Sequence, residues 1–332
     1  MNSPQDVGHA VVYTPEDAAF VAACSEILHE EWSAVSGYLS GTSPAWNDVV
    51  SEWDLTRYTQ TGQWKDLALP LLVGRRSLGR ASAEGAPAAM HLWTAWAESP
   101  RVIGEHFSMD GRAFSLVASH PVYEEEAGDL SHPEVDKQVS LIGHLPPDMG
   151  SQLDVALGLV ELCGGRCREI VRTGFSTLVL LQLPESSPTG ACISFTSRGA
   201  PGAIFLTLTA PILLAESLVH EAVHNVLYTA TRLSAVTLGG RTFLQSPLRR
   251  DPRPLEGVIH QALVLDYLCE FYARLLEHDT VELVARNVPQ ITRRLATCRA
   301  DRDSALAAIR TVGDDLGPLG ATLVSEMMSA ST

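Results

Sequence analysis

Two histidines and one glutamate stand at the spacing of a metal-binding helix. Residues 220–224 read His-Glu-Ala-Val-His, an HExxH motif. In an α-helix, residues four apart lie one turn above each other, so both imidazoles can reach one ion while Glu221 points to its flank. The flanking residues are mostly apolar, and burial of these three groups without a partner would cost free energy. The motif therefore predicts a metal site with His220 and His224 as ligands and Glu221 as the catalytic group beside them.

A mononuclear site needs a third protein ligand, and the sequence offers more than one. The extension of the motif found in metzincins would need glycine at 227 and histidine at 230, but these residues are Leu227 and Ala230. A later helix is the other common source of the ligand. We favour His260, because it interrupts an otherwise apolar run, and Glu256, one turn earlier, is the competing ligand. Acidic residues farther along the same segment are Asp266 and Glu270.

The residues around these positions resemble a known family. The segments are SLVHEAVHNVLY, then SPLRRDPRPLEGVIHQA and EFYARL, preceded by the turn RGAPGAIFL. They are similar to the HExxH proteins encoded beside ribosomally synthesised peptide natural products, whose members resemble iron(II)- and 2-oxoglutarate-dependent peptide β-hydroxylases. The match is most specific between residues 192 and 274, and no motif of residues 1–190 carries it.

The resemblance implies an oxidative function and its cofactors. The expected reaction is hydroxylation of a side-chain β carbon in a precursor peptide, with Fe(II) as the metal and 2-oxoglutarate as the co-substrate. His220, His224 and His260 would then hold the iron, and open coordination positions would remain for the 2-oxo acid and O₂. The C5 carboxylate of 2-oxoglutarate calls for a planar cation.

Three arginines in the loop before His260 are candidates for binding this carboxylate. They are Arg249, Arg250 and Arg253. We prefer Arg253, because prolines on both sides fix its backbone. Each of the three can equally be a solvated loop charge.

Two other functions fit the same motif. In a zinc metallopeptidase, His220, His224 and either Glu256 or His260 would hold Zn(II), and Glu221 would deprotonate the attacking water. A peptide-binding protein with a structural metal site is the non-enzymatic alternative, which gives Glu221 no role.

The elements that must position these residues form an α+β chain. We expect a mostly helical protein with a small sheet, containing antiparallel strands, that leads into the HExxH helix. The expected regions are a mainly helical one over 1–135 and a metal-site region over 136–332, which can also form one continuous domain. Helices are predicted over 15–40, 147–164, 211–233, 255–277, 281–297, 302–311 and 318–330; strands over 113–119, 138–145, 177–183, 192–197 and 203–209; and a solvated acidic loop at 124–126.

Composition excludes several classes of function. The 332 residues carry 39 acidic and 24 basic side chains, a formal charge of −15, and 45% of them are hydrophobic. A negative surplus of this size repels nucleic acid, and the apolar content excludes intrinsic disorder. The sequence shows no signal peptide and no apolar run long enough for a membrane span, so we expect a cytoplasmic protein with no membrane partner.

Overall fold

The computed structural model describes residues 103–109, 112–129, 139–144, 146–183, 192–239 and 242–329, with residues 26, 27, 30, 31, 33–35, 37, 38, 75 and 76. This part of the chain is mostly helical and contains a small mixed sheet, which confirms the predicted α+β class. Its elements are β1 (Ile103–Met109), β2 (Arg112–Val117), α6 (Pro121–Asp129), β3 (Ser140–Leu141), α7 (Met149–Cys163), α8 (Gly165–Gly174), β4 (Thr177–Gln182), β5 (Ser194–Thr196), β6 (Ala203–Thr207), α9 (Pro211–Leu233), β7 (Phe243–Leu244), β8 (Arg253–Pro254), α10 (Leu255–Leu276), α11 (Glu282–Arg310), the 3₁₀ turn Gly313–Asp315 and α12 (Pro318–Ser329).

The main sheet has the strand order β1-β2-β4-β6-β5, and β3 pairs with the end of β4. Strands β2, β4 and β6 are parallel to one another, whereas β1 and β5 are antiparallel to their neighbours. All five residues of β6 and the four central residues of β4 are buried. Such uninterrupted apolar strands are typical of strands covered on both faces.

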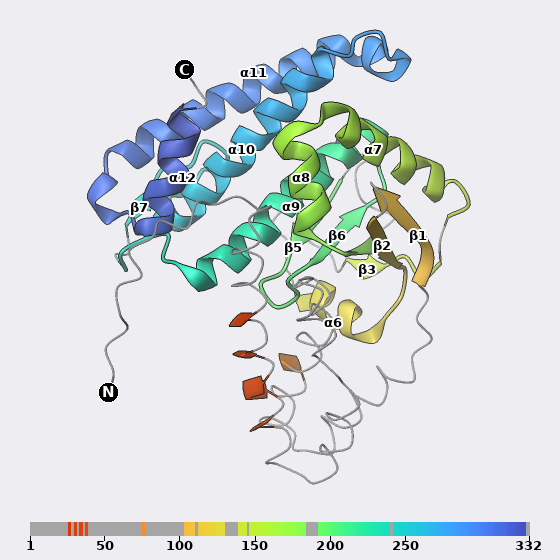
Figure 1. Cartoon of the computed structure of the whole chain (residues 1–332), viewed down its shortest axis with the longest axis horizontal. Helices are drawn as coiled ribbons and strands as arrows, with labels where there is room; N and C mark the ends of the chain where they lie inside the picture. The colour runs from red at the N-terminus through yellow and green to blue at the C-terminus, as the bar shows by residue number, and fades with distance from the viewer. Residues whose placement is uncertain are drawn as a thin grey trace.

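Helices cover the two faces of this sheet (Figure 1). Side chains alternate between the faces along a strand. On β5, Ser194 bonds to Glu221 of α9, whereas its neighbour Phe195 stacks on Phe205, whose ring also meets Tyr123 of α6. Helices α6 and α9 therefore lie on opposite faces.

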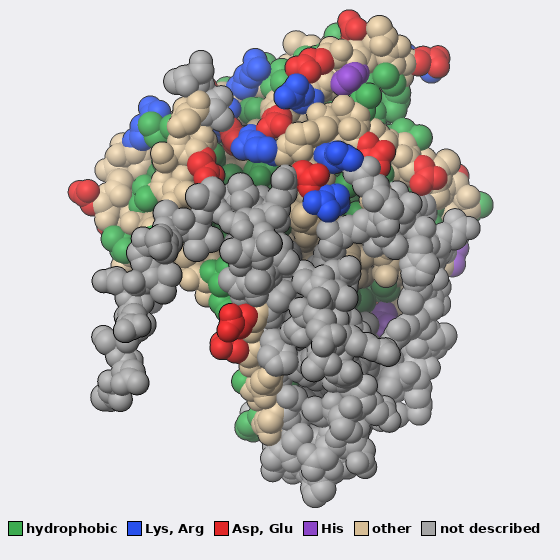
Figure 2. Space-filling model, in the orientation of Figure 1, with side chains coloured by type: hydrophobic (Ala, Val, Ile, Leu, Met, Phe, Trp, Pro, Cys, Tyr) green, Lys and Arg blue, Asp and Glu red, His purple; other side chains and the backbone are tan. Residues whose placement is uncertain are grey.

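A layer of long helices adjoins α9 on the side away from α6 (Figure 1). Helix α10 packs against α9, α11 and α12. On the face drawn in Figure 2, acidic and basic side chains alternate over these helices. No helix among the described residues is long and apolar enough to cross a membrane.

Several predicted elements differ from the observed ones. Residues 124–126 were predicted as a solvated acidic loop, but they belong to helix α6, so the prediction of a loop was wrong. Glu124 is exposed as expected, whereas Glu126 is buried against Arg76 and Ser197. The two helices predicted over 281–297 and 302–311 are one helix, α11, because the residues between them include no glycine or proline. Helix α8 was not predicted, and the strand expected over 138–145 is only Ser140–Leu141.

The helices expected in the first hundred residues lie almost wholly outside the described residues. Strand β2 pairs with β4, so strands from both sides of residue 135 share one sheet. The division at that residue stays a prediction.

Candidate metal centre

Helix α9 presents the HExxH histidines on one face and packs its opposite face against α8. Ala222 and Val223, between the two histidines, are fully buried. A Cβ added to Gly174 of α8 would lie 2.9 Å from the Cβ of Ala222, so two small residues permit this close approach. His220 and His224, one turn apart, are thereby directed toward a cleft on the other side.

This cleft has a volume of about 660 Å³, within the usual size of a small-molecule site. It lies between α9, α10, α11, the N-terminal part of β5 and the loop that precedes β8. All three predicted histidines line it. Its described lining residues include Cys192, Ser194, Arg198, Glu216, His220, Glu221, His224, Tyr228, Arg249, Arg253, Glu256, His260, Gln261, Arg294 and Asp301.

The three imidazoles are neighbours through His224. Its ring centroid lies 4.9 Å from that of His220 and 5.9 Å from that of His260. With metal–nitrogen bonds of about 2.1 Å, two imidazoles on one ion have centroids on the order of 5 Å apart. Within the described residues, no three His, Cys, Asp or Glu side chains are already arranged to hold a metal. The structure thus brings the predicted ligands together, and their convergence on one ion stays a prediction.

The buried imidazoles have the protonation state that a metal ligand needs. Burial, with the Arg198 charge, lowers the pKa of His260 to about 3. Burial, together with His220, His260 and Arg253, lowers the pKa of His224 well below its ordinary value. Both rings are neutral at pH 7, and a neutral imidazole carries the lone pair that binds metal.

Two buried ring nitrogens of the cluster are available to bind a metal cation. Nδ1 of His224 and Nε2 of His260 have no hydrogen-bond partner among the described residues. Buried polar atoms are rarely left without one. The residues present therefore fit a bound divalent metal.

Glu221 lies beside this cluster and is held by the sheet. Its side chain is almost fully buried, and Ser194 Oγ of β5 donates a hydrogen bond of 2.8 Å to its Oε1. The same oxygen lies 3.8 Å from Nε2 of His220. The carboxylate is thus fixed at the flank of the predicted metal position.

Glu256, the competing third ligand, is engaged by an arginine. Arg198 donates a hydrogen bond of 2.5 Å to Oε1 of Glu256, and this oxygen lies 3.7 Å from Nε2 of His260. Both candidates are therefore adjacent, and His260 is the one whose nitrogen faces no bonding partner among the described residues.

Two of the three candidate arginines line the cleft. Arg249 and Arg253 do so, whereas Arg250 is exposed and is not among its described lining residues. Arg253 belongs to β8 and pairs in register with Leu244 of β7. Gln245 donates to the carbonyls of residues 249 and 250, which shapes the loop. Neither lining arginine has an ion-pair partner among the described residues.

The cleft also contains a buried carboxylate near the metal-binding motif. Glu216, one turn before His220, accepts hydrogen bonds from Tyr272 of α10 and Arg294 of α11. These bonds tie the three helices together. Of the later acidic candidates, Asp266 is paired with Arg166 and Arg302 instead of lining the cleft.

Four residues that line the cleft are not among the predicted site residues: Ser194, Arg198, Tyr228 and Glu216. Tyr228 and Glu216 lie one turn after and before the motif, so helical spacing could have identified them. The rings of Tyr228, His224 and His260 pack together, with centroids 5.9 Å and 5.3 Å from Tyr228. Ser194 and Arg198 reach the site through strand pairing, which no local pattern reveals.

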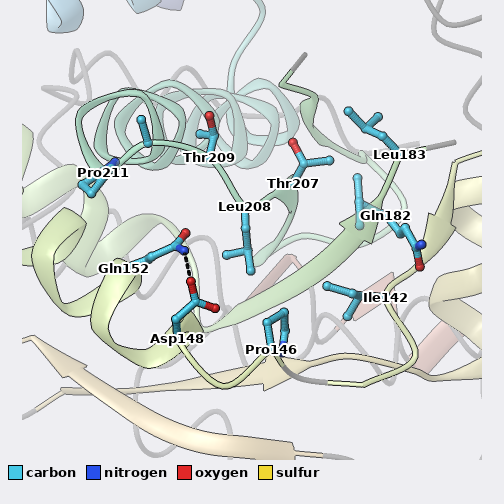
Figure 3. Close-up of a pocket in the computed structure, with 12 residues that line it drawn as sticks. Ile142, Pro146, Asp148, Gln152, Gln182, Leu183, Thr207, Leu208, Thr209 and Pro211 are labelled. Carbon is cyan, nitrogen blue, oxygen red and sulfur yellow. Dashed lines mark hydrogen bonds between the residues drawn. The ribbon is translucent and has the colours of Figure 1, made fainter. Parts of the chain in front are cut away.

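A second cavity, of about 620 Å³, lies where β4 and β6 end (Figure 3). Leu208 and Ile142 point toward its interior, and Gln152 bonds to Asp148. Asp148 is the one titratable side chain among its described lining residues, whereas several such side chains line the cleft with the histidines.

No protein-family model matches the chain, and no curated protein matches it. The class of the site therefore follows from its residues: a cleft in an α+β protein with three clustered histidines, a buried glutamate and two arginines without ion-pair partners among the described residues.

Proposed function

We propose that this protein is an Fe(II)- and 2-oxoglutarate-dependent oxygenase that hydroxylates a side-chain β carbon in a ribosomally synthesised precursor peptide. The observation that carries the proposal is the composition of one cleft. It contains neutral imidazoles suited to a divalent metal and two arginines suited to a dicarboxylate. A peptidase needs the metal-binding imidazoles but has no need of arginines that bind a dicarboxylate.

His220, His224 and His260 would hold the iron. When bound, Fe(II) would supply dioxygen chemistry at an unactivated C–H bond, coupled to oxidative decarboxylation of 2-oxoglutarate to succinate and CO₂. A three-histidine set departs from the more common two-histidine, one-carboxylate set. Glu256 would complete that common set if His260 were not a ligand.

Arg253 is the preferred anchor for the C5 carboxylate of 2-oxoglutarate. Arg198 and Arg294 also line the cleft, but Glu256 and Glu216 neutralise them. Arg249 and Arg253 retain their charge for an incoming anion. The β7–β8 pairing fixes the backbone from which the Arg253 side chain extends, so less backbone freedom is lost when an anion binds.

Glu221 and Ser194 would order the polar side of the site. The hydrogen bond from Ser194 holds Glu221 beside His220, where its carboxylate can bind a water molecule or a ligand-shell hydrogen. Tyr228, packed on two of the histidines, excludes water from their apolar side.

The substrate and setting complete the proposal. The resemblance to the HExxH family favours a peptide encoded beside the gene as the substrate. The net charge of −15 favours a peptide that is basic or neutral. The described cysteines are free thiols, in keeping with a cytoplasmic setting.

One observation favours a zinc metallopeptidase as the second candidate. Glu221 Oε1 lies 3.8 Å from His220 Nε2, a position from which it could deprotonate a metal-bound water. Under this alternative, Zn(II) replaces Fe(II), and the arginines bind the peptide.

The test is to load the protein with Fe(II) under anaerobic conditions and then to add 2-oxoglutarate, O₂ and the precursor peptide encoded beside the gene. We expect a mass gain of about 16 units in the peptide and one succinate per hydroxylation. A Glu221→Gln variant, which keeps the size of the side chain, serves as the matched comparison. Cleaved peptide without succinate would support the peptidase instead.

A further inference from the structure

Arg198 occupies the turn between β5 and β6, and its backbone is held from two sides. Its carbonyl oxygen accepts hydrogen bonds from Arg75 Nη1 at 2.9 Å and Arg232 Nη2 at 2.8 Å. Both of these arginines also bind Glu31. The position from which the Arg198 side chain extends is therefore fixed.

The side chain of Arg198 extends over the histidine cluster. Its guanidinium carbon lies 5.0 Å from the ring centroid of Tyr228, within the range of a cation–π contact. Tyr228 itself packs on His224 and His260. This contact directs the guanidinium toward the start of α10.

One oxygen of Glu256 lies between the guanidinium and an imidazole. Oε1 is 2.5 Å from Arg198 Nη2 and 3.7 Å from His260 Nε2. A carboxylate this close to a candidate ligand competes for the same ion. While Oε1 is bonded to a cation, its lone pairs and charge are less accessible to a metal.

We propose that Arg198 is a positioning residue for the metal centre: its ion pair with Glu256 withdraws that carboxylate, so that the metal is held by three imidazoles. This inference rests on the metal site of the proposed function. In this inference Arg198, which is not itself a predicted ligand, determines that His260 and not Glu256 is the third ligand. Removal of the guanidinium then admits Glu256 as a ligand.

The test is a double-mutant cycle on equilibrium binding of Co(II) to the full chain. The variants are Arg198→Met, which keeps an unbranched side chain beside Tyr228 but removes the charge, Glu256→Gln, and the double variant. Arg198→Lys keeps a cation and is the conservative control. The Arg198 side chain is 63% exposed, so these changes should leave the fold intact, which thermal denaturation checks.

We expect Arg198→Met to bind Co(II) about tenfold more tightly, a change of about 1.4 kcal/mol, because an anionic carboxylate is added to the ligands. Its Co(II) absorption spectrum should change, because a carboxylate joins the ligands. Glu256→Gln, Arg198→Lys and the double variant should stay within about twofold of wild type and keep its spectrum.

Three results would overturn the inference. The first is that Arg198→Met matches wild type in affinity and spectrum. The second is that the double variant retains the change. The third is that Glu256→Gln alone loses binding, because Glu256 is already a ligand. In all three, the wild-type protein still binds metal, so the proposed function survives. A wild-type protein that binds no metal would instead remove the proposed function and this inference together.

Discussion

Replacing Arg253 by glutamine tests whether the cleft binds a dicarboxylate. A hydrogen bond between charged groups contributes about 1.5–3 kcal/mol to binding. Arg253 is only half-buried, so solvent screening places the expected loss near the lower end, about 1.5–2 kcal/mol. This loss corresponds to roughly 12- to 30-fold weaker binding of 2-oxoglutarate. The β7–β8 hydrogen bonds involve the backbone, so the strand should persist.

The assay is titration calorimetry of the Zn(II)-loaded protein, in which no turnover consumes the ligand. Arg250→Gln is the matched control, since Arg250 lies in the same loop but outside the described lining of the cleft, and it should bind within about twofold of wild type. 2-Oxobutyrate lacks the C5 carboxylate. Wild type should prefer 2-oxoglutarate over it, and Arg253→Gln should lose most of that preference.

The assignment of Arg253 to the C5 carboxylate is refuted if Arg253→Gln and Arg250→Gln weaken binding equally. It is also refuted if Arg253→Gln weakens both ligands alike, because the lost contact would then not involve the C5 carboxylate.

Three further predictions concern the scaffold. Asn225 is fully buried; it accepts a hydrogen bond from the N–H of Gly202 in the β5–β6 turn and donates one to the carbonyl of Ala203 at the start of β6. Asn225→Ala should therefore lower the free energy of unfolding by about 3 kcal/mol, and a urea titration showing a loss of less than about 1 kcal/mol would contradict this. Gly174→Ala should cost about 1–3 kcal/mol because its Cβ would meet α9, whereas Gly158→Ala, with open space around it, should raise the melting temperature slightly; equal melting temperatures would argue against the close contact. The pKa values of His224 and His260 are lowered in the folded chain, so the unfolded chain takes up protons near pH 6.5 while the folded chain does not. The free energy of unfolding therefore falls as the pH drops below that value, and the metal-free protein should be about 3 kcal/mol less stable at pH 5.5 than at pH 7.5. A stability that does not change with pH would show that the two rings are not buried and neutral.

Local patterns predicted most of the second half of the fold. The starts of α9 and α10 follow from prolines at their N-termini, and the β5–β6 hairpin follows from the glycines and proline of its turn. These signals lie within a few residues of the structures they specify. The prediction at residues 124–126 was wrong because Glu126 is buried by Arg76 and Ser197, which are distant in sequence.

Some residues of the candidate site could likewise be predicted from local spacing, whereas others are placed by contacts between distant segments. His220 and His224 could be placed together because one helical turn fixes their spacing, and His260 stood out as a polar residue in an apolar run. The proximity of His260 to His224 depends instead on the packing of α9 against α10. Ser194 and Arg198 reach the cleft through the pairing of β5 with β6, a contact that sequence spacing does not encode.

The binding of one metal ion by the three imidazoles is tested most directly by measuring metal content after anaerobic equilibrium dialysis against Fe(II). The proteins compared are wild type, His220→Ala, His224→Ala and His260→Ala. The cluster of three imidazoles predicts one iron per wild-type chain and less than about a tenth of an equivalent in each variant. A full equivalent of iron in any folded single variant would contradict the assignment of that histidine as a ligand.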